Sequence, residues 1–277
     1  MPELPEIETV KLGIEKTVLG SVIISTKIFR RDLRFPVEEN LEKSILYKRV
    51  IGVGRRSKYL LFFMDKKLTL VLHLGMSGKI NLSTESVNEY KPNKHDHLLL
   101  SFDNGFLLIY NDPRRFGFVE TIEGEYTDYR RFKHVGIEPL SKNFDEKYLW
   151  SRIKNSSRAL KNILMDQKIV AGLGNIYVSE ALWDSRIKPT RIGQDMPLID
   201  CKKLVVSIKK VLKKAIRFGG TTLKDFRQVG GEVGYFQNKL QVYGKDGEAC
   251  FRSKCRGTVE KIIISGRSTF YCSFCQR

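Results

Sequence analysis

Four cysteines near the C-terminus constrain the fold of this chain more than any other feature. Cys250, Cys255, Cys272 and Cys275 follow the spacing C-x4-C-x16-C-x2-C. Four thiolates close a tetrahedral Zn²⁺ site, and paired cysteines on two tight turns place the sulfurs correctly. The alternative is a set of buried or idle cysteines without a metal. We expect one structural zinc ion here.

The residues between the two cysteine pairs predict a β-hairpin. Residues 259–265 and 267–271 would be its strands, turning at Ser265 and Gly266. A module of this size has almost no hydrophobic core, so zinc would supply most of its folding energy. Arg267 lies near the hairpin tip, where a guanidinium can reach a phosphate. The fifth cysteine, Cys201, lies on an amphipathic helix and is expected in the core.

The net charge indicates the class of partner. Lys and Arg total 49 against 31 Asp and Glu, giving a net charge of +18 and a pI of about 9.7. This excess predicts a polyanionic partner, nucleic acid first and an anionic membrane surface second. No stretch approaches the roughly 18 apolar residues of a membrane span, and no signal peptide is evident, so we expect a soluble cytoplasmic protein. In that reducing compartment, cysteines favour a metal over disulfides.

Hydrophobic periodicity divides the chain into a β-rich and a helical part. A helix that stops at Gly20 is followed by eight predicted strands, at 22–29, 50–53, 59–64, 68–74, 79–82, 98–102, 106–110 and 117–122. Turn residues at 65–67 and 103–105 predict hairpins, and the strand spacing favours a β-sandwich or flattened barrel. A composition change near residues 125–143 marks a linker. Beyond it, helices are predicted at 148–155, 158–165, 176–183 and 199–218.

The first residues contain a candidate nucleophile. Removal of Met1 would leave Pro2 with a terminal secondary amine, and α-amino groups have a pKa of about 8, so part of it is unprotonated. Such an amine attacks a sugar C1′ or an aldehyde to give an iminium ion. Glu3 lies beside it for proton exchange, and Glu6 lies one helical turn later. A structural reading also stands, because proline followed by glutamates is typical of a helix N-terminus.

A glycine-containing turn joins two of the predicted helices. Residues 170–177 read VAGLGNIY, and a helix beginning near Asn175 would offer free N–H groups to an anion. Phosphate binding is a natural use for such a turn. A plain turn between helices is equally consistent with this motif alone.

Several motifs, in this order along the whole chain, resemble the formamidopyrimidine-DNA glycosylase family. They are MPELPE at 1–6, KYLL at 58–61, HLGMSG at 73–78, KHDH at 94–97, DPRRFG at 112–117, AGLGNIY at 171–177, GGTTLKDF at 219–226, LQVYG at 240–244 and GRSTFYC at 266–272. The four residues between Cys250 and Cys255 depart from the family's commoner two. This departure keeps the ligands but leaves the shape of the first knuckle open.

The resemblance implies catalytic roles. Pro2 resembles the nucleophile that attacks C1′ of the damaged nucleotide, and Glu3 resembles the acid that helps open the sugar. Glu6 is implied as a supporting carboxylate. Lys58 resembles the lysine of the elimination steps; the alternative for Lys58 is a solvated lysine at a strand end. Arg267 is implied both as a phosphate contact and in proton transfer during the final elimination.

The resemblance also implies DNA contacts. Met76, Arg114 and Phe116 resemble the trio that fills the gap left by an extruded base, where inserted groups partly replace lost stacking. Residue type alone would place Met76 and Phe116 in the core. The implied backbone contacts comprise His95, Asn175, Arg158, Lys161 and, in a loop at 221–235 that resembles the one closing over a flipped lesion, Lys224. Lys154 adds positive charge beside them.

The family implies a two-domain α+β protein. We expect an N-terminal catalytic β-sandwich domain with a leading helix at 1–131, a linker at 132–143, a helix–two-turn–helix domain with the lesion loop at 144–239 and a zinc finger at 240–277. Its implied activity is a DNA glycosylase and AP lyase that removes oxidised purines and cleaves the strand by β,δ-elimination. Damaged double-stranded DNA would bind in a basic cleft between the domains of a monomer.

Two other functions compete with this hypothesis. An enzyme similar to endonuclease VIII would act on oxidised pyrimidines, but its start resembles Pro-Glu-Gly-Pro-Glu, whereas Leu4 holds the variable position here. A DNA-binding protein without catalysis is the second alternative. The presence of Pro2, Glu3 and Lys58 argues against it.

Overall fold

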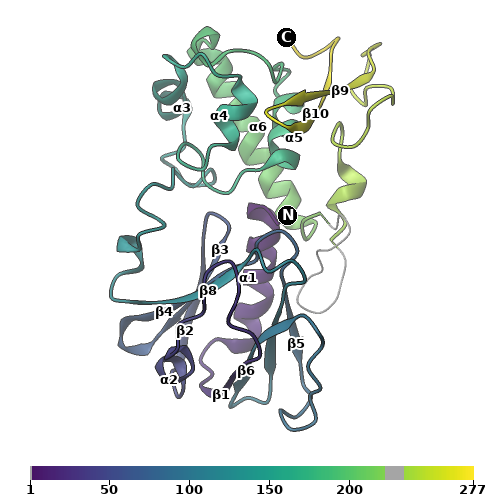
Figure 1. The fold of residues 1–277 in the computed structure, drawn as a ribbon. Helices are drawn as coiled ribbons and strands as arrows, with labels where there is room; N and C mark the ends of the chain where they lie inside the picture. The colour runs from purple at the N-terminus through teal and green to yellow at the C-terminus, as the bar shows by residue number, and fades with distance from the viewer. Residues whose placement is uncertain (1, 222–233) are drawn as a thin grey trace. The chain divides into compact units, whose positions relative to one another are not determined.

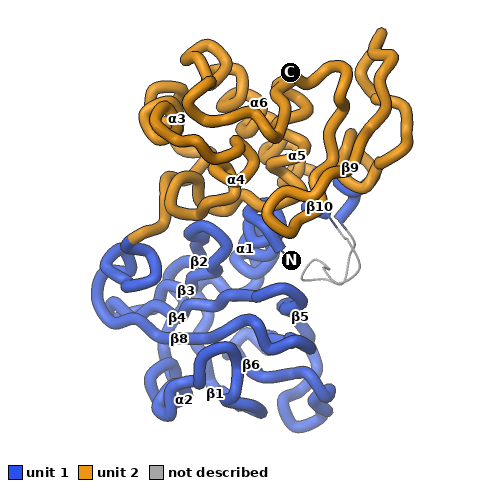
Figure 2. Tube along the Cα trace, turned by 45° about the horizontal axis from the view of Figure 1, so that its top comes forward, with its two compact units in different colours: residues 1–133, 218–237 blue, residues 134–217, 238–277 orange. Residues whose placement is uncertain are grey.

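The computed structural model describes residues 2–221 and 234–277 of the 277 residues. The chain forms two compact units. The first contains residues 1–133 and 218–237, and the second contains residues 134–217 and 238–277 (Figures 1 and 2). This grouping differs from the predicted boundaries, because residues 218–237 belong to the N-terminal unit. No helix in the described ranges has the length and apolar character needed to cross a membrane.

The first unit is a β-sandwich behind a leading helix. Helix α1 spans Leu4–Val18. One four-stranded sheet has the order β1-β6-β7-β5, and the other has the order β2-β3-β4-β8 (Figure 1). All pairings are antiparallel, and the strands are β1 Ile23–Ile28, β2 Val50–Arg56, β3 Tyr59–Met64, β4 Leu68–His73, β5 Lys79–Ser83, β6 Asp96–Phe102, β7 Leu107–Asn111 and β8 Phe118–Glu123. The eight strands predicted from sequence are therefore confirmed.

Alternating side chains build the core of this unit. In strands, every second residue faces the same side, and in the helix the apolar positions recur at three- and four-residue spacing. One buried cluster accordingly combines residues of α1 and of both sheets, among them Ile7, Val10, Ile14, Leu60, Phe62, Leu70, Leu72, Leu98, Leu100, Leu108 and Tyr110. The unit also holds the short helix α2 (Leu41–Ile45) and the 3₁₀ turns η1 (Asp65–Lys67) and η2 (Tyr126–Asp128). Helix α2 was not predicted, because five residues are too few to show a helical period.

The second unit combines four helices with a β-hairpin. The helices are α3 (Glu146–Ile153), α4 (Leu160–Met165), α5 (Asn175–Asp184) and α6 (Leu198–Arg217). Helix α6 buries one face, which includes Cys201 as predicted. The hairpin strands β9 (Val259–Ile264) and β10 (Arg267–Cys272) turn at the predicted residues, Ser265 and Gly266, and pair with Arg267 opposite Ile264. Two 3₁₀ turns, η3 (Gly193–Asp195) and η4 (Phe236–Lys239), complete the described elements.

Candidate functional site

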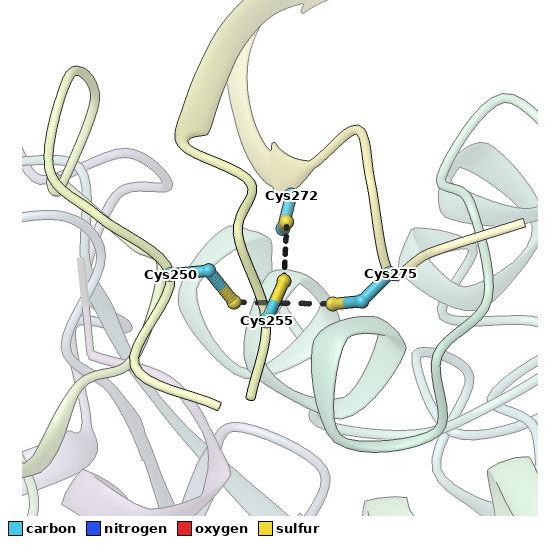
Figure 3. Close-up of side chains that lie close together, drawn as sticks. All are labelled: Cys250, Cys255, Cys272 and Cys275. Atoms are coloured by element: carbon cyan, nitrogen blue, oxygen red, sulfur yellow. Dashed lines mark hydrogen bonds between the residues drawn. The ribbon is translucent and has the colours of Figure 1, made fainter. Parts of the chain in front are cut away.

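The four predicted zinc ligands converge at the base of the hairpin. The sulfurs of Cys250, Cys255, Cys272 and Cys275 all lie within 4.8 Å of one another (Figure 3). Cys250 Sγ lies 3.9 Å from Cys275 Sγ, and Cys255 Sγ lies 3.7 Å from Cys272 Sγ. Zinc–sulfur bonds of about 2.3 Å in a tetrahedron require sulfur–sulfur distances of about 3.8 Å. The cluster therefore has the donor set and the spacing of a closed metal site.

The backbone around the cluster explains how the longer first gap is accommodated. Lys254, the residue before Cys255, adopts a positive φ of 63°, a left-handed conformation found in tight turns. A Cβ on Gly257 would lie 2.8 Å from Cys272 Sγ, so only glycine fits there. The indole N–H of Trp183 donates to Cys250 Sγ at 3.4 Å. A donor of this kind orients a thiolate ligand and tunes its affinity for the metal.

The N-terminus of α1 gathers the candidate catalytic carboxylates. Pro2 and Glu3 are buried, and Glu3 is the N-cap of the helix. Glu3 and Glu6 form a capping box, in which Glu6 Oε2 accepts the Glu3 N–H at 2.9 Å. Both carboxylates are buried, with exposures of 3% for Glu3 and 2% for Glu6. Glu6 thereby fixes the backbone that carries Pro2 and Glu3.

Glu6 also holds the start of a distant segment. Its other oxygen, Oε1, accepts hydrogen bonds from Thr221 N–H at 2.8 Å and from Thr221 Oγ1 at 3.0 Å. Thr221 forms an antiparallel bridge with Tyr235, and Phe236 N–H donates to the Gly220 carbonyl at 3.1 Å. Both described ends of the 222–233 stretch therefore lie beside α1. Lys224, a predicted DNA contact, lies outside the described residues.

Lys58 lies in the turn between β2 and β3 and is only 9% exposed. This burial does not fit the alternative of a solvated strand-end lysine. Arg55 fixes the turn to α1, because its Nε lies 2.7 Å from Glu8 Oε2 and its Nη1 donates to the Ser57 carbonyl at 2.9 Å. Ser57 itself has a φ of 54°, a conformation that a tight turn requires. The lysine is thus presented by a rigid turn.

The positive charge of Lys58 affects the pKa of His73 at the end of β4, the strand that pairs with β3. Burial first, and the charge of Lys58 second, lower the pKa of His73 to about 4, so its imidazole is neutral at pH 7. His73 Nδ1 accepts the Gly75 N–H at 3.1 Å, and its ring stacks on Phe118 with an interplanar angle of 13°. A neutral, packed histidine here shapes the loop after β4. That loop carries Met76.

The predicted wedge residues are exposed. Met76 is 39% exposed and Phe116 is 42% exposed, so the core position suggested by residue type alone is wrong for both. The reason is that both lie on turns beyond the strands, after Gly75 and before Gly117. The Arg114 guanidinium lies 4.6 Å from the centre of the Phe116 ring. These side chains form an exposed apolar and cationic surface on the first unit.

Three predicted DNA contacts meet in the second unit, around the first residues of β10. Asn175 is the first residue of α5, and its Nδ2 donates to the Ser268 carbonyl at 2.9 Å. Lys161 Nζ donates to the same carbonyl at 3.2 Å and to Thr269 Oγ1. Arg267, adjacent to this carbonyl, is exposed. Helices α4 and α5 therefore fix the strand that presents Arg267.

Lys161 is fully buried, with 0% exposure. Burial first, and the nearby charge of Arg267 second, lower its pKa to about 8. Its ammonium is enclosed by the hairpin, which differs from the solvent-facing phosphate contact suggested by its basic neighbours. The structure gives Lys161 a supporting position behind Arg267.

The other predicted contacts do not belong to the group around β10. His95 is partly buried just before β6, and its carbonyl accepts the Asp112 N–H at 3.0 Å. Arg158 is exposed and pairs with Asp166 at 3.1 Å. Lys154 is exposed, with its ammonium 4.7 Å from the Trp150 ring centre. Side-chain cations that remain at the surface are available to a polyanion.

Among the buried carboxylates that the sequence did not reveal, Glu180 and Asp112 each accept several hydrogen bonds. Glu180 on α5 is 3% exposed, and its Oε1 accepts the N–H groups of Val242 and Tyr243, each at 3.0 Å. Asp112 is fully buried between two loops. A charged residue inside an apolar helix such as α5 is a signal that could have found Glu180. Asp112 lies in a motif already noted, but no local pattern shows what it contacts.

Comparisons with known proteins agree along the whole chain. The profile of the formamidopyrimidine-DNA glycosylase N-terminal domain matches residues 1–119, and that of the formamidopyrimidine-DNA glycosylase H2TH domain matches residues 135–227. The formamidopyrimidine-DNA glycosylase of Ruegeria sp. (strain TM1040) is 44% identical over 283 residues, with 100% of both chains covered. That of Zymomonas mobilis is 41% identical over 278 residues, again with full coverage.

Solved structures show the same similarity. The complex between Lactococcus lactis Fpg and an abasic-site DNA superimposes with a TM-score of 0.90 at 38% identity, covering 99% of each chain. A structure of MutM with DNA containing carbocyclic 8-oxo-G gives a TM-score of 0.89 at 39% identity, covering 100% of each chain. The two-domain α+β fold predicted from sequence is confirmed.

Proposed function

Because this chain belongs to the formamidopyrimidine-DNA glycosylase family, we propose that Pro2 and Glu3 carry its chemistry on damaged DNA. The enzyme is a DNA glycosylase and AP lyase of base excision repair that acts on oxidised purines. The observation that carries the proposed site is the N-terminus of α1, where Pro2 and two buried carboxylates lie together.

In the proposed mechanism, the Pro2 amine attacks C1′ of the damaged nucleotide as the base departs. The resulting iminium ion acidifies the C2′ proton, whose removal breaks the strand on the 3′ side; a second elimination breaks it on the 5′ side. Glu3 exchanges protons with the opening sugar, since a buried carboxyl next to the amine is placed for that transfer. Lys58 assists the eliminations, and Arg267 binds a phosphate and takes part in the final proton transfer.

The lesion base must leave the helix before this chemistry starts. Met76, Arg114 and Phe116 are proposed to enter the gap it leaves, and their exposure suits this role. Exposed cations and the net charge of +18 provide the sequence-independent attraction to the duplex. Asn175 and His95 are proposed to contact phosphates. The lesion loop, including Lys224, is proposed to close over the extruded base.

Zinc is the metal proposed for the four-cysteine cluster. Four thiolates at near-tetrahedral spacing suit Zn²⁺, and the hairpin they close has little core of its own. When bound, the ion would hold the hairpin and thus Arg267 in place, with no part in the reaction. We further propose that the enzyme acts as a cytoplasmic monomer.

Duplexes with single defined lesions test the function. We expect release of 8-oxoguanine and formamidopyrimidines, followed by strand cleavage that leaves phosphate on both sides of a one-nucleotide gap. An oxidised pyrimidine in the same sequence serves as the comparison, and it matters because one solved Lactococcus lactis Fpg complex contains an oxidised pyrimidine in its DNA. Faster excision of the pyrimidine than of either purine would favour the endonuclease VIII-like alternative, and DNA binding without cleavage would exclude catalysis.

A further inference from the structure

The Asp112 carboxylate joins two loops that carry the proposed wedge. The first loop follows β4 and comprises residues 74–78; the second comprises residues 112–117. Asp112 is 0% exposed, and its Oδ1 accepts Ser77 Oγ–H at 2.6 Å and Arg114 N–H at 3.3 Å. Its Oδ2 accepts Gly117 N–H at 2.9 Å. One buried side chain thus receives hydrogen bonds from both loops.

The fourth donor to Asp112 is Tyr110 OH, which lies 3.3 Å from Oδ2. All four donor groups are neutral. Ser77 Oγ in turn accepts the Arg114 N–H at 3.2 Å, so the loops are also joined directly. A carboxylate has no proton to donate and accepts at both oxygens, which matches an environment made of donors alone. Hydrogen bonds to a charged group are stronger than those between neutral groups.

The backbones of the two loops pack directly against each other. A Cβ on Gly75 would lie 2.5 Å from the backbone nitrogen of Gly117 and 2.5 Å from the carbonyl carbon of Phe116. A Cβ on Gly117 would overlap Tyr110 OH and the His73 carbonyl. No side chain fits at this junction. The backbones of the two loops that carry Met76 and Phe116 are therefore in direct contact.

A third segment supports the second loop from its other side. Arg115 forms an ion pair with Asp32, and Arg34 N–H donates to the Gly117 carbonyl at 3.2 Å. A surface cavity of about 610 Å³ beside this segment is lined by Asp32, Leu33, Arg34, Arg114, Arg115 and Phe116. The wedge loops are thus held by partners within the first unit.

We propose that Asp112 is a positioning residue for base extrusion, which holds the Met76 loop through Ser77 and the Phe116 loop through the N–H groups of Arg114 and Gly117. This proposal rests on the wedge role given under the proposed function. Insertion into a duplex needs the wedge side chains in one fixed arrangement, since the gap they fill is set by the base stack. Asp112 supplies that arrangement before DNA binds.

Asp112→Asn and Ser77→Ala test the proposal. Asparagine keeps the shape but turns an NH₂ group toward at least one donor, and alanine removes the direct link to the first loop. We expect 8-oxoguanine excision from a duplex to slow about tenfold or more for Asp112→Asn and about threefold for Ser77→Ala. Cleavage of a preformed abasic site should stay within about twofold for both, because no base has to be extruded.

A fluorescent base gives a readout that general instability does not move. With 2-aminopurine placed next to the lesion, the rise in fluorescence on unstacking should slow in both variants and in Phe116→Ala. Asp103→Asn and Ser101→Ala are the matched controls. Asp103 accepts the Val22 N–H at 2.9 Å away from the wedge loops, and Ser101 is buried in β6. Thermal unfolding of every variant shows which ones remain folded at the assay temperature.

The outcomes separate this inference from its premise. If Phe116→Ala slows excision from a duplex while Asp112→Asn and Ser77→Ala behave like the controls, the role of Asp112 is overturned and the wedge role stands. An equal loss on duplex lesions and abasic sites in Asp112→Asn makes the residue structural and also overturns it. If Phe116→Ala leaves the ratio of duplex excision to abasic-site cleavage unchanged, the wedge role itself is contradicted. If Asp112→Asn does not fold, Ser77→Ala decides, because it retains the buried carboxylate and its other donors.

Discussion

Glu6 and Thr221 are joined across 215 residues of sequence, because Glu6 Oε1 accepts both the N–H and the hydroxyl of Thr221. The second oxygen of the same carboxylate accepts the Glu3 N–H. One buried side chain therefore connects the backbone of the proposed catalytic residues to the first residue of the proposed lesion loop. A substitution of Glu6 should therefore disturb both the N-terminus of α1 and the position of Thr221.

Glu6→Gln should impair excision more than binding. The amide keeps one acceptor but presents an NH₂ group either to Glu3 N–H or to Thr221 N–H, and a buried donor left without an acceptor costs about 1–3 kcal/mol. We expect single-turnover excision of 8-oxoguanine to fall about tenfold or more, with DNA affinity unchanged. Single-turnover kinetics and equilibrium binding at one salt concentration measure the two effects.

The control for this prediction is Glu15→Gln, on the same helix. Glu15 is partly exposed and pairs with Lys11 at 2.7 Å, so its loss should change neither quantity. Thr221→Val, which removes only the hydroxyl donor, should have a smaller effect than Glu6→Gln. Equal activity in Glu6→Gln and Glu15→Gln would show that the connection to Thr221 does not serve catalysis.

One zinc ion per chain should be present in protein purified without added metal. Trp183→Phe removes the N–H that donates to Cys250 Sγ, and loss of such a partner typically lowers metal affinity about 10- to 100-fold. Competition with a chromophoric chelator measures the affinity. Trp150→Phe, at the exposed second tryptophan, is the matched control. Metal-free protein with an intact hairpin would contradict the account of this cluster.

Arg267 should contribute to DNA binding in a salt-dependent manner. Each phosphate contact releases about one counterion, so Arg267→Ala should reduce the slope of log affinity against log salt by about one unit on any sequence. Lys261→Ala removes an exposed positive charge from the same hairpin and serves as the control. An unchanged slope, or an equal change in Lys261→Ala, would remove Arg267 from the specific phosphate contacts.

The buried Lys161 predicts a pH dependence of stability. Its pKa falls from 10.5 to about 8 in the folded protein, so between these values the unfolded chain binds the extra proton. Stability from this residue therefore rises as pH increases from about 8 to about 10.5. Lys161→Met should lack that rise. Denaturant unfolding at several pH values checks the difference, and identical slopes for both proteins would contradict it.

The strands and the cysteine cluster could be predicted because their signals are local. The strand predicted at 68–74 lies between turn residues, and β4 spans Leu68–His73. The spacing of the four cysteines predicts a cluster that could hold a metal ion, without reference to the fold between them. The hairpin turn at Ser265 and Gly266 could also be predicted, and both residues have a positive φ. Features formed by residues close together in the sequence leave a local pattern, and one sequence is enough to recognise it.

Contacts between distant segments could not be predicted in the same way. No residue near Thr221 in the sequence predicts its hydrogen bonds to Glu6. Ser77, which donates to Asp112, is likewise 35 residues away from it in sequence. Lys161 was assigned from its charge, yet packing against β10 buries it completely. The core position that residue type alone suggests for Met76 and Phe116 is wrong, because apolar composition does not show where the backbone turns toward solvent. These positions depend on tertiary packing.

Borohydride trapping of the covalent intermediate is the decisive measurement for Pro2 as the nucleophile. An iminium formed by the terminal amine of Pro2 is reduced to a stable amine, so enzyme and lesion-containing DNA should become cross-linked. Peptide mapping should then place the link on the nitrogen of Pro2, in protein whose intact mass lacks Met1. Glu3→Gln should bind DNA near normally but give almost no cross-link from an intact lesion. A link that maps to Lys58, or that forms equally well with Met1 retained, would contradict the assignment of Pro2 as the nucleophile.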